Sequence, residues 1–244
     1  MKPQYVPREK GSPVLLTKTR NRLSLLGSYF QLQRKRANIE EYLEFIQTTA
    51  RRMYAPLQVS SEILSLMKLV ASEKPKSVLE IGTANGGTLF LLARSAAPDA
   101  HLISLDLPAG EFGGGYSPIR IPLYKSFARG AQRVSLIRGN SHAAESLQQV
   151  KSLLNERSLD FLLIDGDHTY HGVRQDFELY APLVRQGGIV ALHDVAKHPA
   201  GHNCDVDRFW AELKVKYRTF EFIENLNQCW AGIGVVFIDS LVTP

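Results

Sequence analysis

The stretch SVLEIGTANGGT, residues 77–88, decides the fold of this chain. A short apolar run at 77–81 leads directly into a turn with glycines at 82, 86 and 87, and an apolar run of helical character follows from about residue 89. Glycines let the backbone turn sharply and approach a ligand closely, and the first turn of the next helix offers free amide groups. The stretch therefore predicts a strand, a ligand-binding turn and a helix in succession.

Short apolar runs alternate with amphipathic runs through most of the remaining sequence, a pattern typical of a parallel sheet covered on both faces. The predicted strands lie at 77–81, 101–105, 134–138, 160–164 and 188–192, and the predicted helices at 89–96, 143–155, 172–184 and 209–217. Two last strands, 220–223 and 232–238, lie too close together for a crossover helix and predict an antiparallel edge pair. The predicted fold class is α/β, a Rossmann-like, doubly wound, seven-stranded and mostly parallel sheet.

The N-terminal part of the chain has a different character. Proline and glycine punctuate the first 27 residues without any period, and a helix is predicted from about Asn38. A second helix begins at Ser60 or Ser61. We therefore expect an arm and a helical cap at 1–57 and one larger domain at 58–244. Arg51 and Tyr54 are candidates for the mouth of its pocket; alternatively, this region only packs on the sheet or mediates homo-oligomer formation.

Composition narrows the class of protein. The chain has 244 residues, of which 44% are hydrophobic and 22% charged, as expected for an ordinary globular domain. Its apolar runs are far shorter than the roughly 18 to 20 residues of a membrane span, and its start lacks the pattern of a signal peptide. Cys204 and Cys229 form no paired motif, so a reducing, cytoplasmic location without membrane contact is expected.

The net charge of +5 is unevenly distributed. Up to Ser60 there are 11 basic and 4 acidic residues, a net +7, which leaves 5 − 7 = −2 for the rest. A near-neutral body with a basic N-terminal segment is not the broad basic face of a nucleic-acid-binding protein. The segment is interpreted as a solvated helix face, or as a clamp for an anionic small molecule or partner.

The glycine turn is typical of a nucleotide site, but two common types are excluded. A dinucleotide motif would need glycine at Ala84, and the lysine and hydroxyl of a P-loop are missing. Glu80 precedes the first glycine by two residues, where a carboxylate repels phosphate but suits a cation. Asp106 ends the next strand, where a carboxylate can bind both ribose hydroxyls. An acidic pocket around an adenosine indicates a sulfonium ligand.

With these residues the chain resembles the class I S-adenosylmethionine-dependent methyltransferases over about residues 58–240. The resemblance implies that the turn at Gly82 and Thr83 holds the methionine part of the cofactor and that Asp106 holds the ribose. It also implies that Asn140 and Ser141 flank the adenine, although many relatives have aspartate in place of Asn140. The full set of expected cofactor-binding residues is Glu80, Gly82, Thr83, Asn85, Gly86, Asp106, Asn140, Ser141 and Asp165.

Chemically active side chains follow the next two strands. Asp165 and Asp194 end the predicted strands 160–164 and 188–192, and His168 follows three residues after Asp165. Carboxylates and imidazoles around one crevice can hold a divalent cation with open positions for substrate hydroxyls. A metal lowers the pKa of a hydroxyl, and a histidine can accept its proton, which contributes about 10² to 10⁴ in rate. We predict catalytic roles for His168 and Asp165.

This arrangement resembles the metal-dependent O-methyltransferases of macrolide sugars, the cephalosporin-hydroxylase-like branch and, more loosely, the catechol type. That resemblance implies that Asp165 and Asp194 bind the metal, Mg²⁺ by expectation, and that His168 is the general base. Where such relatives often have Glu-Asp, this chain has His193-Asp194, so His193 joins the expected metal ligands. The histidine, cysteine and aspartate spacing at 193–205 matches no structural zinc pattern.

The predicted function is methyl transfer from S-adenosylmethionine to a hydroxyl of a small molecule, such as a sugar or a polyketide. One alternative is methylation of nitrogen or of nucleic acid with the help of the basic segment, but the strand at 160–164 lacks the motif of amino methyltransferases. Another alternative is a nucleotide-binding protein without catalysis. The long insertion at 107–130 is predicted to be a lid over the cofactor, hinged at 113–115.

Overall fold

The computed structural model describes residues 37–48, 56, 58–110, 112, 115–199 and 201–239. It divides into two compact units, 1–38 and 39–244, and every helix and strand named below belongs to the second unit. The predicted N-terminal arm, together with Arg51 and Tyr54, lies outside the described residues.

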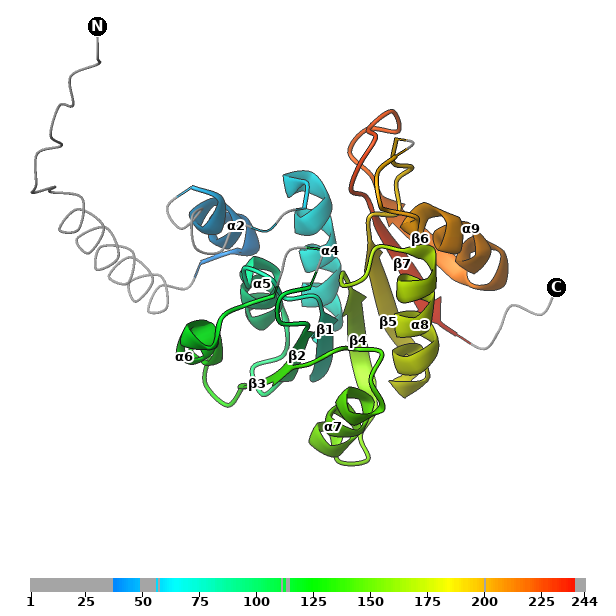
Figure 1. Cartoon of the computed structure of the whole chain (residues 1–244). Helices are drawn as coiled ribbons and strands as arrows, with labels where there is room; N and C mark the ends of the chain where they lie inside the picture. Colours follow the sequence, from blue (N-terminus) through cyan, green and yellow to red (C-terminus); the bar gives the residue numbers. More distant parts are fainter. Residues whose placement is uncertain are drawn as a thin grey trace, which may run out of the picture. The chain divides into compact units, whose positions relative to one another are not determined.

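Seven strands form one sheet in the order β3-β2-β1-β4-β5-β7-β6 (Figure 1). They are β1 (Ser77–Ile81), β2 (His101–Asp106), β3 (Arg133–Arg138), β4 (Leu159–Ile164), β5 (Val184–His193), β6 (Arg218–Phe222) and β7 (Ile233–Ile238). Strands β1 to β5 pair in parallel, and β7 lies antiparallel between β5 and β6. The α/β class, the mostly parallel sheet and the antiparallel edge pair are confirmed.

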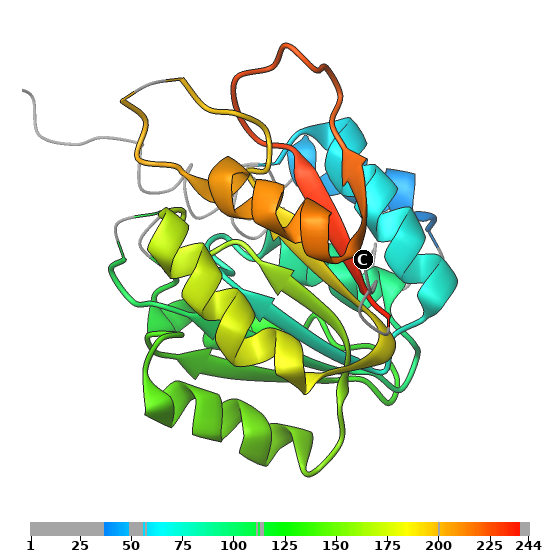
Figure 2. The ribbon, with the colours of Figure 1, turned by 90° about the vertical axis from the view of Figure 1, so that its right-hand side faces the viewer.

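Two layers of helices cover the sheet (Figures 1 and 2). Helices α2, α4 and α5 pack together on one face, and α7, α8 and α9 lie on the other. Their bounds are α2 (Ile39–Gln47), α4 (Ser60–Glu73), α5 (Gly87–Ser95), α7 (Ala144–Leu154), α8 (Tyr170–Tyr180) and α9 (Val206–Lys216). Three shorter helices are η1 (Pro118–Arg120), α6 (Ile121–Lys125) and η2 (Ala181–Leu183). Helix α2, which lies in the region predicted as a helical cap, thus continues the layer formed by α4 and α5.

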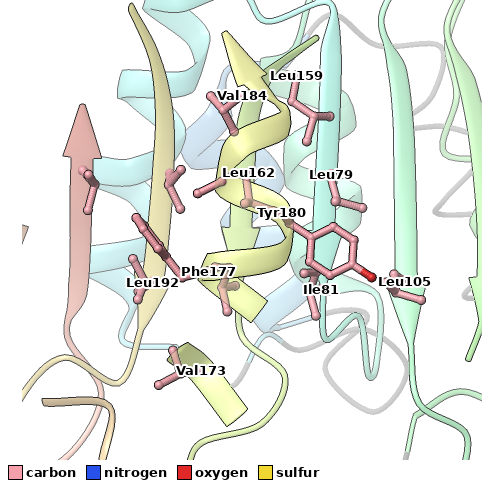
Figure 3. Close-up of a cluster of buried hydrophobic side chains, with 14 of the residues drawn as sticks. Leu79, Ile81, Leu105, Leu159, Leu162, Val173, Phe177, Tyr180, Val184 and Leu192 are labelled. Carbon is pink, nitrogen blue, oxygen red and sulfur yellow. The ribbon is translucent and has the colours of Figure 1, made fainter. Parts of the chain in front are cut away.

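The core on the α7, α8 and α9 face consists of aliphatic side chains from the central strands, against which aromatic residues of the helices pack (Figure 3). Leu79 and Leu162 of neighbouring strands are fully buried beneath Tyr180. Parallel strands buried on both faces are expected to be continuously apolar, as the buried sequence SVLEI of β1 is except at Ser77, where it begins, and at Glu80. A buried carboxylate in the middle of such a strand calls for a local explanation.

Two predicted boundaries differ from the structure by four residues. The helix predicted at 172–184 ends at Tyr180, and η2 follows with a proline near its start. Proline lacks the amide hydrogen that an α-helix interior requires, so the helix gives way to a tighter turn. Strand β5 begins at Val184 rather than 188, because Gly187 and Gly188 are accommodated within the strand at an irregular register with β4.

Candidate active site

The glycine turn lies where the sheet order reverses. Strand β1 pairs with β2 on one side and with β4 on the other, so the chain segments after β1 and β4 leave the sheet side by side. A Cβ atom on Gly82, whose φ is +90°, would lie 1.9 Å from the carbonyl oxygen of Asp165. Only glycine fits this approach, and the crevice at such a reversal is the usual ligand site of open α/β sheets.

Glu80 of β1 supports the glycine turn through a hydrogen bond with Thr83. Its side chain is fully buried, one carboxylate oxygen accepts a hydrogen bond from the Thr83 hydroxyl at 2.6 Å, and that hydroxyl lies 2.7 Å from the hydroxyl of Ser104. Burial raises the pKa of Glu80 to about 8, and the nearby carboxylates of Asp106 and Asp165 add to the effect. The side chain lines neither cavity described below, so its effect on a ligand, through charge and through Thr83, stays a prediction.

A first cavity of about 280 Å³ opens beside the turn. Of the predicted cofactor residues, Gly82, Asp106, Asn140, Ser141 and Asp165 line it, together with Ala84 and His142. One carboxylate oxygen of Asp106 accepts a hydrogen bond from the Ala84 amide at 2.7 Å, and burial raises the pKa of Asp106 to about 6. The expected ribose and adenine residues therefore border one space.

The segment predicted as a lid is in part a fixed support for the turn. Tyr124 of α6 is fully buried, and its hydroxyl donates to the carbonyl of Ala84 at 2.9 Å. A Cβ atom on Gly86 would lie 2.6 Å from the Tyr124 ring, so this glycine allows the ring to pack against the turn. Of the predicted hinge residues, 113 and 114 lie outside the described residues. Phe112 lines the first cavity and the second cavity as well.

A second cavity of about 360 Å³ lies on the other side of the glycine turn. It contains predicted residues from both groups, namely Gly82, Thr83, Asn85, Gly86, Asp165, His168, His193 and Asp194. Gly82 and Asp165 border both cavities, so a ligand that extends from one to the other would pass these two residues.

His168 and Asp194 form a close pair in the second cavity. His168 Nδ1 lies 2.8 Å from Asp194 Oδ2, and its Nε2 lies 3.7 Å from Asp165 Oδ1. The Phe112 ring stacks on the imidazole with centroids 4.9 Å apart and planes 2° from parallel. Burial opposes protonation, but hydrogen bonds to Asp194 and Cys204 and the charge of Asp165 outweigh it and raise the pKa of His168 to about 10.

His193 completes the group of predicted metal ligands. Its Nδ1 lies 3.1 Å from Asp165 Oδ1 and 3.3 Å from Asp194 Oδ2, and its side chain is 7% exposed. Neither of its ring nitrogens has a hydrogen bond of good geometry among the described residues. Burial disfavours the charged ring, but the two carboxylates raise the pKa of His193 well above its ordinary value. A buried imidazole of this kind needs either a proton or a cation to satisfy the carboxylates around it.

Two sets of ligand atoms could hold a metal ion, and they share Asp194. In the first set, atoms of Asp165, His193 and Asp194 all lie within 4.8 Å of one another; in the second, atoms of His168, Asp194 and Cys204 do so. The first set contains the three predicted ligands, and the ring nitrogens of His193, which have no hydrogen-bond partner among the described residues, are available to a cation. The spacing of residues in the sequence did not indicate that Cys204 lies close to His168 and Asp194, because this contact depends on the path of the loop before α9.

Several residues of the site were not identified from the sequence. Gln58 donates to Asp165 Oδ2 at 2.6 Å, and Thr88 donates to the Gln58 amide oxygen at 3.2 Å. His142 of the first cavity lies 3.3 Å from the fully buried carboxylate of Asp176. Of the two tryptophans, Trp210 is buried, whereas Trp230 is 51% exposed and lines the second cavity. Among these residues only His142 had a signal in the sequence, because it directly follows Ser141, one of the residues predicted to flank the adenine.

No helix among the described residues is long and apolar enough to cross a membrane.

Comparisons with known proteins found curated relatives and solved structures of similar fold. An uncharacterized protein of Sinorhizobium fredii is 27% identical over 150 residues, which are 60% of this chain and 16% of that protein. The chain spans about half the length of a second curated relative, a protein of Acanthamoeba polyphaga mimivirus. The fold matches an O-methyltransferase of Bacillus cereus in complex with S-adenosylhomocysteine, with TM-score 0.56, 20% identity and coverage of 84% of this chain and 92% of the other. It also matches TomG, the Streptomyces achromogenes O-methyltransferase involved in tomaymycin synthesis, in complex with S-adenosylmethionine, with TM-score 0.59, 16% identity and coverage of 87% and 95%.

The family described as "Methyltransferase domain" matches residues 79–195, which run from β1 to the segment just after β5. This range includes the glycine turn and every residue that lines the first cavity. It also includes the predicted catalytic and metal-binding residues Asp165, His168, His193 and Asp194. Residues 79–195, just under half of the chain, thus match a methyltransferase domain, and the solved structures share its fold.

Proposed function

We propose that the protein transfers a methyl group from S-adenosylmethionine to a hydroxyl oxygen of a small molecule bound in the second cavity. The observation that carries the proposal is the placement of His168, Asp165 and Asp194 in a cavity that shares the glycine turn with the predicted cofactor cavity. The two structural neighbours named above are both O-methyltransferases, which supports oxygen as the acceptor atom.

His168 is proposed as the general base. The acceptor oxygen attacks the sulfonium methyl in line, the carbon–sulfur bond breaks, S-adenosylhomocysteine is left, and the acceptor proton passes to a nitrogen of His168. Asp194 orients the ring through the contact at Nδ1, which leaves Nε2 on the side of Asp165. A base must be unprotonated at the working pH, whereas the carboxylates raise the pKa of His168 to about 10.

A divalent cation at Asp165, His193 and Asp194 would remove this obstacle. When bound, the metal supplies positive charge that offsets the two carboxylates and lowers the pKa of an acceptor hydroxyl. The chain holds the site through Gln58, which fixes the second oxygen of Asp165. Mg²⁺ remains the sequence-based expectation, and the two carboxylates suit Mg²⁺ or Mn²⁺, whereas the imidazole of His193 adds a nitrogen donor that suits Fe²⁺ or Zn²⁺.

An acceptor screen tests the proposal. Purified protein is incubated with S-adenosylmethionine carrying a labelled methyl group, sugar, polyketide and phenolic acceptors, and either EDTA or one of the four metals. We expect label on oxygen only when metal is present. Label on a nitrogen acceptor, or transfer that EDTA leaves intact, would contradict the proposed mechanism.

A further inference from the structure

The loop between β6 and β7, residues 223–232, extends beyond the end of the sheet (Figures 1 and 2). Leu226 in this loop is 88% exposed, so the loop is not fixed by burial of its tip. Trp230 near the end of the loop is half exposed and lines the second cavity. A large indole in this position needs a specific support if it is to keep one place at the cavity.

Glu62 of α4 provides that support. Its side chain is only 1% exposed although it is ionisable, and it accepts three hydrogen bonds from the loop. Glu62 Oε1 accepts from the Glu224 amide at 3.0 Å and from Gln228 Nε2 at 2.6 Å, and Oε2 accepts from the Gly232 amide at 3.0 Å. A carboxylate that accepts several N–H groups is among the stronger hydrogen-bonding arrangements in proteins.

The contacts continue from Glu62 to Trp230 itself. Gln228 Nε2 also donates to the carbonyl oxygen of Trp230 at 2.9 Å, so one amide group joins the carboxylate to the tryptophan backbone. Glu62 and Gln228 therefore hold the backbone on both sides of the indole, at 228 and at 232.

The same segment is fastened to the chain that follows Asp194. The Ala196 amide donates to the carbonyl of Ala231 at 2.9 Å, and the Val195 amide donates to the carbonyl of Gly232 at 3.3 Å. Residues 231 and 232 thus lie between Glu62 on one side and residues 195 and 196 on the other. The position of Trp230 is thereby set relative to Asp194, one of the predicted metal ligands.

We propose that Trp230 is a specificity-determining residue of the acceptor site and that Glu62, through Gln228 and Gly232, is its positioning residue. This inference rests on the proposed function, because it takes the second cavity to be the acceptor site. Two aromatic side chains, Trp230 and Phe112, line that cavity, and flat rings stack favourably on such side chains. The acceptor class that fits is a planar aromatic ring that carries the reacting hydroxyl.

The chain offers matched variants for a test. Glu62→Gln keeps the shape of the side chain but replaces one of the two oxygens that accept hydrogen bonds from the loop with an NH2 group, which cannot accept one. Gln228→Ala breaks the same link from the loop side. Glu224→Gln is the control, because Glu224 joins the same loop to the same helix through an exposed contact, at 2.7 Å from the Ser61 hydroxyl. Gln228→Ala decides the matter if Glu62→Gln does not fold.

The readout is fluorine NMR of full-length protein labelled with 5-fluorotryptophan. The chain has two tryptophans, so two resonances are expected, and the one missing from Trp230→Phe belongs to Trp230. In Glu62→Gln and Gln228→Ala we expect the Trp230 resonance to move towards that of free 5-fluorotryptophan while the Trp210 resonance stays in place. Neither resonance should move in Glu224→Gln. An unchanged Trp230 resonance in both link variants would overturn the role of Glu62.

Two probes test the acceptor class: 3,4-dihydroxybenzoate, a planar aromatic diol, and methyl α-D-glucopyranoside, a non-aromatic polyol. With S-adenosylhomocysteine and Mn²⁺ present, the aromatic diol should shift the Trp230 resonance and the glucoside should not. Trp230→Ala should weaken binding of the aromatic diol roughly tenfold and leave cofactor affinity within twofold. Stronger binding of the glucoside, or no binding of the aromatic diol to the parent protein, would overturn the proposed class.

These outcomes also separate this inference from the proposed function. Aromatic diol binding that depends on Trp230, without methyl transfer, would contradict the proposed function alone. Methyl transfer to the aromatic diol with the same KM in Trp230→Ala as in the parent would contradict this inference alone.

Discussion

Asp194 accepts a hydrogen bond from His168 Nδ1 at 2.8 Å while its own backbone is left-handed, with φ of 62°. The conformation lies directly after β5, where the chain turns away from the sheet, and it directs the carboxylate back towards the end of β4. Left-handed backbone is rare for residues other than glycine, but Asp and Asn tolerate it better than most. Burial would raise the pKa of Asp194, yet the two imidazoles beside it hold that pKa well below its ordinary value.

Replacing the proposed base tests its role directly. His168→Ala should reduce kcat by about 10² to 10⁴, because proton removal then depends on solvent, while cofactor affinity stays close to that of the parent. The matched control is His171→Ala, an exposed histidine on α8, which should leave kcat unchanged. Steady-state kinetics and calorimetry distinguish the two effects. Equal loss of activity in both variants would point to a general disturbance of α8 rather than to loss of a base.

The charge of Asp194 can be removed without disturbing its backbone. Asp194→Asn keeps a side chain that accepts left-handed backbone, so the variant should fold, but metal affinity should fall by about 100-fold or more because a ligand charge is lost. Titration with Mn²⁺, followed by electron paramagnetic resonance, measures the free metal. An Asn variant with parental metal affinity would exclude Asp194 as a ligand.

Metal binding should release protons. The pKa of His193 is raised well above its ordinary value and that of His168 to about 10, so both rings carry protons at neutral pH before a cation binds. A metal ligand must be unprotonated, so apparent metal affinity should rise between about pH 6 and pH 9. Calorimetry in buffers of different ionisation enthalpy counts the released protons. Metal affinity that does not change with pH would show that the cation binds elsewhere.

The buried carboxylates of the glycine turn should distinguish a cationic from a neutral ligand. Burial raises the pKa of Glu80 to about 8 and that of Asp106 to about 6, so a sulfonium favours loss of their protons and S-adenosylhomocysteine does not. The affinity ratio of S-adenosylmethionine to S-adenosylhomocysteine should therefore increase from pH 5 to pH 9. In Glu80→Gln the increase above pH 7 should disappear. If Glu80→Gln showed the same increase in the affinity ratio above pH 7, a titratable group other than Glu80 would be responsible for it.

The raised pKa of Glu80 also makes the free energy of unfolding depend on pH. The pKa of Glu80 is about 8 in the folded state and about 4.5 unfolded, so between these values only the folded chain holds the proton, and the parent loses stability as the pH rises. The Gln side chain does not titrate. Glu80→Gln should thus gain stability relative to the parent by up to about 4 kcal/mol from pH 4.5 to pH 8. Denaturant unfolding at several pH values measures this, and parallel curves for the two proteins would contradict it.

The pair of His142 and Asp176 gives the opposite dependence. The hydrogen bond with buried Asp176 raises the pKa of His142 against the effect of burial, so its stabilisation is complete below about pH 6.5 and is lost as the pH passes the folded value. Asp176→Asn should be less stable than the parent at pH 6 by about 1 to 3 kcal/mol. At pH 9 the difference should vanish or reverse, because the parent then has an unpaired buried carboxylate. A difference that is constant with pH would contradict this account.

The sequence predicted the sheet and most element positions because strands buried on both faces and amphipathic helices have strong, different periods. It also placed His168, His193 and Asp194 beside the glycine turn, since the ends of parallel strands meet at one edge of the sheet. Gln58, Phe112 and Trp230 escaped prediction for a common physical reason. Each lies outside the strand ends and reaches the cavity through loop packing, which leaves no periodic signal in the sequence.

Glu62 shows the same limit. Its position in an otherwise amphipathic helix resembles that of any solvated acidic residue, and only the return of the loop at 223–232 buries it. Contacts across more than 160 residues of chain depend on the assembled fold, so local sequence patterns do not reveal them.

Calorimetric titration of the full chain with S-adenosylmethionine, S-adenosylhomocysteine and NAD, first with EDTA and then with Mg²⁺ or Mn²⁺, tests the central claim most directly. The account predicts micromolar binding of both sulfur nucleotides, no binding of NAD, and at least a tenfold loss of affinity in Asp106→Asn, which lacks the charged acceptor for the ribose hydroxyls. Failure of both sulfur nucleotides to bind under every metal condition would contradict the account.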